Sequence, residues 1–240
     1  MLPRFHLDHE FDQSDVELTG AEAHHLTNVL RLGAADFVEL FNGRGRSAQG
    51  VIVGVDRDRV SVRIREQQQH KRPHRRRVTV AAAVPKANRL RWMVEKLTEL
   101  GVDRFVPLAT QRGVVPPGPA RLRKVEQTMI AAARQSRRNF LMTIEPVRSW
   151  ADFIHEDDDA EVLVAHPSGE PMTIGDTPID QPLHLAVGPE GGFSEAEVEL
   201  ADNSGARLIR LTETILRVET AAIAFASTAL MDRRFRQAVC

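Results

Sequence analysis

The stretch with the clearest chemical meaning is a glycine-rich loop, Val187-Gly188-Pro189-Glu190-Gly191-Gly192-Phe193-Ser194. It follows an apolar run typical of a buried strand and precedes a helix-start pattern. Glycines at such a turn let the backbone approach a ligand, and free amides at the helix start can donate to it. Because Glu190 would repel a phosphate, the loop favours a neutral or cationic ligand, such as a sulfonium cofactor with a free amino group. A tight strand-to-helix turn without a ligand would use the same glycines.

A second stretch whose residues could take part in chemistry runs from Leu211 to Ala222, again between a predicted strand and a predicted helix. Arg217 and Glu219 lie where the loop meets that helix, and Thr220 is a possible cap. A carboxylate near a helix N-terminus is favoured by the helix dipole. The local pattern alone favours a plainer interpretation, a capped helix with a surface ion pair.

The elements that must position these loops alternate between strand and helix from residue 78 onward. Continuous apolar runs predict buried strands at 78–84, 105–108, 162–165, 183–187 and 208–211. Apolar residues at helical spacing predict helices at 90–100 closed by Gly101, from Leu122 onward, at 194–202 and at 219–235. This alternation predicts an α/β fold with a parallel sheet covered by helices.

The first part of the chain has a different rhythm, with short alternating strands predicted at 37–41, 50–55 and 60–64. Thr19-Gly20-Ala21-Glu22 has the capping-box pattern, in which Glu22 would reach back to the Thr19 amide. A small barrel with one helix is the expected result. Residues 67–77 are polar and basic, so they predict a linker that divides the chain into domains at 1–72 and 73–240.

Composition limits the class of protein. The chain has 240 residues, 42% of them hydrophobic, and a formal net charge of -1, which excludes a disordered chain. A single cysteine, Cys240, excludes an internal disulfide and a thiolate metal cluster. A polar start and the absence of a long apolar run predict a soluble cytoplasmic protein without membrane contact. Basic clusters at 71–77 and 134–139 suit either RNA phosphate or plain solvated surface.

Taken together and in order, Gly188 to Phe193 and Ile215 to Ala221 closely resemble the signature of the RsmE-type methyltransferases. Further matching parts are Pro3-Arg4-Phe5, residues 25–32 and 96–102, Arg112, Gln135-Ser136 and Arg138. The resemblance covers nearly the whole chain. It departs from the family pattern at Thr212, Thr214, Arg134 and residues 85–89.

The resemblance implies a PUA-like N-terminal β-barrel that binds RNA and a C-terminal SPOUT domain whose parallel sheet contains a trefoil knot. It implies methyl transfer from S-adenosylmethionine to N3 of a uridine in 16S ribosomal RNA of the small subunit. It also implies a homodimer with an active site at the two-fold interface. The sequence itself predicts no metal site.

The expected site residues fall into three groups. The expected cofactor-binding residues are His166, Val187, Gly188, Pro189, Glu190, Gly191, Gly192, Leu211, Ile215, Leu216 and Thr220. The catalytic candidates are Arg217, as a stabiliser of developing charge, and Glu219, as a base or orienting group; the alternative is that both only hold the loop closed. The expected RNA contacts are Arg4, Arg31, Arg75, Arg76, Arg112, Gln135 and Arg138.

Two rival functions remain at this level. A barrel with basic clusters would also suit a non-catalytic RNA-binding module acting in ribosome assembly. An enzyme that uses the glycine loop for a nucleotide is disfavoured, because no Gly-Lys-Ser/Thr follows the loop and no Gly-x-Gly-x-x-Gly occurs.

Overall fold

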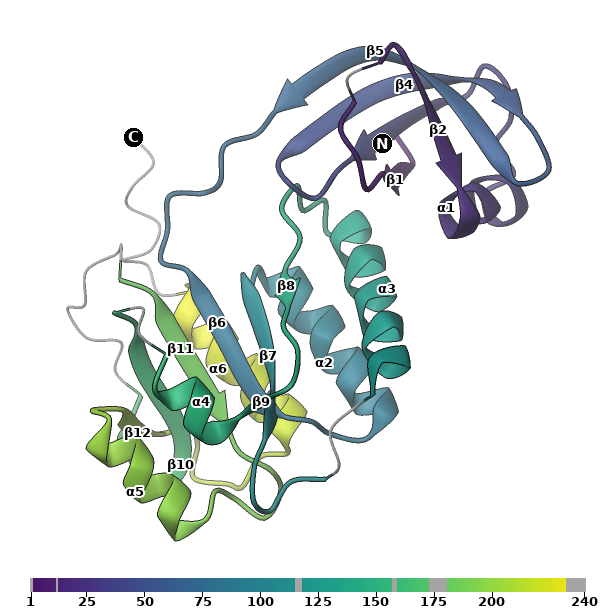
Figure 1. Cartoon of the computed structure of the whole chain (residues 1–240). Helices are drawn as coiled ribbons and strands as arrows, with labels where there is room; N and C mark the ends of the chain where they lie inside the picture. The colour runs from purple at the N-terminus through teal and green to yellow at the C-terminus, as the bar shows by residue number, and fades with distance from the viewer. Residues whose placement is uncertain (1, 12, 115–117, 157–158, 173–180, 232–240) are drawn as a thin grey trace. The chain divides into compact units, whose positions relative to one another are not determined.

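The computed structural model describes residues 2–11, 13–114, 118–156, 159–172 and 181–231 of the chain. The chain divides into two compact units (Figure 1). Unit 1 contains Met1–Pro73 and Ala133–Leu141, and unit 2 contains His74–Ala132 and Met142–Cys240. The sequence division after residue 72 places 133–141 in the second domain, whereas in the structure this segment packs with unit 1.

Unit 1 is built on one five-stranded sheet with the order β1-β3-β4-β5-β2. Its strands are β1 (Arg4–His6), β2 (Asp15–Thr19), β3 (Phe37–Phe41), β4 (Arg46–Val55) and β5 (Arg59–Gln69). Two register shifts between β4 and β5 increase the local twist, and Figure 1 shows the sheet strongly curled. Within the described residues β1 does not pair with β2. The expected barrel is therefore an open, curled sheet around an apolar core that includes Phe5, Leu26 and Leu40.

The helix of unit 1 starts differently from the capping-box prediction. Helix α1 (Gly20–His24) continues into a π-helical turn, η1 (His25–Val29), and Thr19 makes no side-chain cap. The Glu22 carboxylate instead accepts the backbone N–H of His6 at 3.1 Å and lies 3.5 Å from Nη1 of Arg134. Burial raises the pKa of Glu22 above its ordinary value. The capping-box prediction is wrong here, because partners distant in sequence take the carboxylate.

Unit 2 contains the predicted parallel sheet, with the strand order β12-β10-β11-β6-β7-β8 and β9 paired to β7. Its strands are β6 (Val78–Ala83), β7 (Arg104–Ala109), β8 (Thr143–Ile144), β9 (Arg148–Ser149), β10 (Glu161–Pro171), β11 (Leu183–Val187) and β12 (Arg207–Arg210). Strand β10 continues well past its predicted end at residue 165, and its register against β12 shifts between Ala165 and Glu170.

Helices cover both faces of this sheet, as Figure 1 shows with α2 and α6 behind it and α4 and α5 in front. The helices are α2 (Ala87–Leu100), α3 (Pro119–Gln135), α4 (Trp150–Ile154), α5 (Glu195–Asn203) and α6 (Val218–Met231). Gly101 ends α2 with φ of 103°, and Ser194 and Glu197 form the predicted capping box of α5. The predicted continuation of the last helix to residue 235 lies outside the described residues. None of the helices in the described part of the chain is long and apolar enough to cross a membrane.

A charged cluster in unit 2 centres on the Glu156 carboxylate. Arg104 donates two hydrogen bonds of 2.7 Å to the Glu156 carboxylate, and Arg148 lies 3.1 Å from the same group. The hydrogen bonds from Arg104 hold the pKa of Glu156 below its ordinary value. A carboxyl group with a lowered pKa in the folded state stabilises the fold above its unfolded-state pKa, and this contribution is lost as the pH falls through the folded-state pKa.

Substituting Glu156→Gln should therefore destabilise unit 2 at neutral pH by about 1 kcal/mol, because one partly exposed but bidentate ion pair is lost. The difference from the unmodified protein should shrink as the pH falls below the ordinary carboxyl range. Urea unfolding at several pH values between about 7 and 3 measures it. A difference that stays constant with pH would contradict the assignment, and Glu199→Gln, at an exposed position of α5, serves as the control.

Candidate active site

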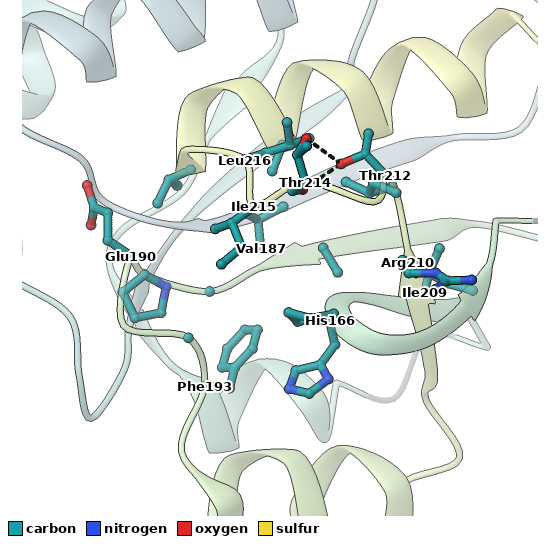
Figure 2. Close-up of a pocket in the computed structure, with 18 of the residues that line it drawn as sticks. His166, Val187, Glu190, Phe193, Ile209, Arg210, Thr212, Thr214, Ile215 and Leu216 are labelled. Carbon is teal, nitrogen blue, oxygen red and sulfur yellow. Dashed lines mark hydrogen bonds between the residues drawn. The ribbon is translucent and has the colours of Figure 1, made fainter.

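A cavity of about 470 Å³ opens in unit 2 at the carboxyl ends of the neighbouring strands β10, β11 and β12. Figure 2 shows that its walls come from the ends of these strands and from the two loops that follow β11 and β12. Its lining residues are Arg112, Ala165, His166, Pro167, Val187, Gly188, Pro189, Glu190, Gly191, Gly192, Phe193, Ile209, Arg210, Leu211, Thr212, Glu213, Thr214, Ile215, Leu216, Val218 and Ala221. This is the edge at which open α/β sheets bind their ligands.

The structure brings the predicted cofactor residues together. All of them line this cavity except Thr220, which is exposed within the first turn of α6. His166 follows the buried part of β10, and its Nδ1 lies 2.7 Å from Oγ of Ser168 and 3.3 Å from the backbone nitrogen of Ser168. Among the lining residues that the sequence did not predict are Phe193, Ile209 and Arg210. Phe193 directly follows the glycine loop, so proximity could have found it, whereas the other two depend on strand order.

The glycine-rich loop is a tight turn packed on an aromatic base. The Gly192 N–H donates to the Pro189 oxygen at 2.8 Å, and Gly192 has φ of +70°, which favours glycine. A Cβ on Gly188 would lie 2.9 Å from the Phe193 ring. That ring packs against Trp150 with centroids 4.4 Å apart. Packing on the Phe193 ring thus holds the loop in place, and its backbone lines the cavity.

The second loop, which joins β12 to α6, is shaped by Thr212 and Thr214, the two threonines that depart from the family pattern. Oγ1 of Thr212 donates to the Thr214 carbonyl oxygen at 2.6 Å, which closes a short turn (Figure 2). Beside this turn Ile215 is 90% exposed although it is strongly apolar. An exposed apolar side chain at the mouth of a cavity is suited to cover a bound ligand.

The two catalytic candidates do not line the cavity. Arg217 is exposed and directly precedes α6, where its carbonyl oxygen accepts the Ala221 N–H at 2.8 Å. Glu219 is only 5% exposed, and its Oε1 lies 3.6 Å from Nε of Arg89. Nη1 of Arg89 also lies 3.6 Å from Oε1 of Glu190. This geometry ties the start of α6 to the start of α2, which favours the alternative in which Glu219 has a structural role.

Three of the predicted RNA contacts have structural partners instead. Arg4 is 4% exposed, and its Nε lies 3.1 Å from Glu39. Arg75 lies 2.7 Å from Asp103, and Arg76 is 1% exposed and donates to Glu161 at 3.3 Å. A phosphate would have to compete for these guanidinium groups with ion pairs that are buried or half-buried. The structure therefore argues against Arg4, Arg75 and Arg76 as RNA contacts.

The other predicted RNA contacts are more accessible. Arg31 and Gln135 are exposed, and Arg138 is half-buried. Arg112 is exposed, but its Nη1 donates to the Gly191 oxygen at 3.1 Å and it lines the cavity. Arg112 is thus part of the same site as the glycine-rich loop.

Comparison with known proteins gives one consistent result. A family model described as an RNA methyltransferase domain matches residues 71–230, and one described as an RNA methyltransferase PUA domain matches residues 18–65. Ribosomal RNA small subunit methyltransferase E of Bacillus subtilis is 31% identical over 219 residues, which cover 86% of this chain and 86% of that protein.

Solved structures agree over nearly the full length. The ribosomal RNA small subunit methyltransferase E of Neisseria gonorrhoeae bound to S-adenosylmethionine is 25% identical with a TM-score of 0.86, covering 95% of this chain and 96% of that chain. A methyltransferase of Legionella pneumophila in complex with the bound cofactor SAM is 28% identical with a TM-score of 0.88, covering 95% and 97%. The chain therefore belongs to the RNA methyltransferase family that includes ribosomal RNA small subunit methyltransferase E.

Proposed function

We propose that this protein transfers the methyl group of S-adenosylmethionine to N3 of a uridine in 16S ribosomal RNA of the small subunit. The observation that carries the proposal is the cavity formed by the glycine-rich loop and the second loop at the ends of three adjacent parallel strands. The relatives from Neisseria and Legionella hold this cofactor, and the uridine follows from the resemblance of the two loops to the RsmE-type signature.

The residues around the cavity fit the cofactor chemically. Ile209, Leu216 and Phe193 provide apolar wall suited to an adenine ring, and the loop backbone offers polar groups around it. The lining carries two carboxylates, Glu190 and Glu213, alongside two arginines, Arg112 and Arg210, so it lacks the excess of positive charge that a polyphosphate needs.

When bound, the cofactor supplies an electrophilic methyl group, and the chain supplies geometry and charge. A direct displacement forms the bond from N3 to the methyl carbon as the bond from sulfur to that carbon breaks, so nitrogen, carbon and sulfur must lie nearly in line; the two loops would hold the methyl donor for this. The N3 proton must pass to a base, solvent water included, and a cation close to uridine O2 or O4 would stabilise the uridine anion that remains. Arg217 is exposed at the junction of the second loop and α6, and we assign it this role. Because N3 lies on the Watson–Crick edge, the target uridine must be unpaired or extruded.

An Arg217→Ala variant should bind S-adenosylmethionine normally and methylate RNA about 100-fold more slowly in a single turnover, since one charge-stabilising donor is lost. Calorimetry measures the affinity, and rapid quenching at saturating cofactor and RNA measures the rate. Arg123→Ala, at an exposed position of α3, is the matched control. Loss of cofactor affinity with an unchanged rate at saturation would remove Arg217 from the chemistry.

We further propose that the protein is a homodimer. Helix α6 is apolar nearly all round, and Ile223, Ala224 and Leu230 on it remain half-exposed in the single chain. A second copy would cover this surface. Analytical ultracentrifugation at micromolar concentration should give twice the chain mass, and a monomer would reject this part of the proposal.

The function as a whole is tested in two steps. Calorimetric titration with S-adenosylmethionine should show saturable binding, which a purely RNA-binding module would not show. Mass-spectrometric mapping of ribosomal RNA from cells with and without the gene should then show one uridine whose N3 methylation depends on this protein. Unchanged methylation of 16S RNA would contradict the proposed substrate.

A further inference from the structure

Glu197 joins two loops that are distant in sequence. Its side chain is buried, with 5% of the residue exposed. One carboxylate oxygen accepts the Ser194 N–H at 2.8 Å, which is the local capping bond of α5. The other accepts the Gln111 N–H at 2.8 Å, from the loop that follows β7. A helix cap needs only the first bond, so the second requires a separate explanation.

The residue after Gln111 reaches the cavity. Nη1 of Arg112 donates to the Gly191 oxygen at 3.1 Å and approaches the Phe193 oxygen at 3.4 Å. A Cβ on Gly191 would lie 3.5 Å from Cβ of Arg112, so the stem of the arginine passes close to the glycine loop. Arg112 is therefore a wall of the cavity, and its backbone is anchored one residue earlier by Glu197.

We propose that Glu197 is a positioning residue for cofactor binding: by fixing Gln111 it holds Arg112 across Gly191 and so preforms one wall of the cavity. A binding site that is already ordered does not lose affinity to ordering its own loops. A carboxylate suits this task because two oxygens accept from two backbone donors, and each bond to a charged acceptor is stronger than a neutral one. The inference rests on the proposed binding of S-adenosylmethionine.

The substitution Glu197→Gln tests this with almost no change of shape. The glutamine amide has a single acceptor oxygen, so one of the two backbone N–H groups loses its partner. We expect the bond to Ser194, which is local, to survive and the bond to Gln111 to be lost. The dissociation constant for S-adenosylmethionine should rise about ten-fold, as expected for one lost charge-assisted bond in a buried position.

Two variants on the same helix separate positioning from stability. Glu195→Gln changes an exposed carboxylate in the same first turn and should leave both affinity and melting temperature unchanged. Ser194→Ala removes the hydroxyl that accepts the Glu197 N–H and leaves the bridge to Gln111 in place. It should lower the melting temperature and change the dissociation constant less than about two-fold. If Glu197→Gln, like Ser194→Ala, lowers the melting temperature but changes the dissociation constant less than about two-fold, Glu197 is only a helix cap and the inference fails.

A double-mutant cycle asks whether Glu197 acts through Arg112. Arg112→Ala alone should weaken cofactor binding, and adding Glu197→Gln should then weaken it little further, because the wall is already missing. Fully additive effects on the dissociation constant would overturn the inference.

Hydrogen exchange of the unmodified protein without cofactor gives a test that needs no variant to fold. The Gln111 amide should be protected to about the same degree as the Ser194 amide, since both donate to one buried carboxylate. Rapid exchange at Gln111 would overturn the inference. Absence of S-adenosylmethionine binding by the unmodified protein would instead refute the proposed function, so the two failures are distinguishable.

Discussion

Alanine at Gly169 should abolish cofactor binding and lower the free energy of unfolding of unit 2 by about 3 kcal/mol or more. Gly169 lies in the part of β10 where the register against β12 shifts. A Cβ built there would lie 2.4 Å from the backbone nitrogen of Ile209 and 2.5 Å from the backbone carbon of Leu208. Backbone atoms cannot rotate away as a side chain end can, so β10 and β12 would have to separate. Ile209 lines the cavity, and its displacement would open the wall.

Urea unfolding and calorimetric titration with S-adenosylmethionine measure the two effects of Gly169→Ala. Gly118→Ala is a matched control in the same unit, because a Cβ there has nothing within 4 Å. It should cost no more than about 1 kcal/mol, the scale of a changed residue at a helix start. Wild-type stability together with wild-type affinity in Gly169→Ala would show that the strands do not approach each other this closely.

The parallel sheet could be predicted because its strands are continuous apolar runs and its helices have recognisable ends. Ser194 and Gly101 mark two of those ends, and both act as expected. The extension of β10 to Pro171 could not be predicted in this way. Residues 166–171 contain two prolines and a glycine without apolar alternation, and their strand geometry depends on pairing with β12, which comes much later in the chain. The trefoil knot expected from the resemblance stays a prediction.

The two loops of the candidate site could be placed at one cavity from the sequence because each loop carries its own pattern. The glycine loop and the second loop were found by composition and by position after a strand. Sequence did not show that Arg112 belongs to the cavity or that Glu197 reaches Gln111, because both contacts join residues about eighty positions apart. Glu22 is a similar case: the local pattern predicts a helix cap, whereas in the structure its carboxylate contacts Arg134, which is distant in the sequence.

The basic run at 71–77 shows why charge in a sequence is a weak guide to its use. Arg75 and Arg76 look like their exposed neighbours in the sequence, yet they pair with Asp103 and Glu161. Composition gives the number of cations in a segment but does not show which of them form buried ion pairs in the folded protein. The distinction has consequences for how each arginine responds to mutation.

Replacing Arg76 with methionine should lower the free energy of unfolding by about 3 kcal/mol, because it breaks a buried ion pair and removes one cation from the Glu161 carboxylate. Arg76 is 1% exposed and donates to Oε2 of Glu161, while Arg207 donates to Oε1 at 2.8 Å. Methionine keeps much of the side-chain length, so the loss measures charge more than volume. Urea unfolding of unit 2 at pH 7 is the measurement.

The neighbouring residue supplies the matched control. Arg77 is exposed, so Arg77→Met should leave stability within about 0.5 kcal/mol. If the basic run contacts RNA, Arg77→Met should weaken RNA binding and lower its salt dependence by about one counterion. Arg76→Met, measured well below its unfolding transition, should leave both RNA affinity and salt dependence unchanged. If Arg76→Met were instead as stable as the unmodified protein and defective in RNA binding, Arg76 would be an RNA contact. Its ion pair with Glu161 would then make no measurable contribution to stability.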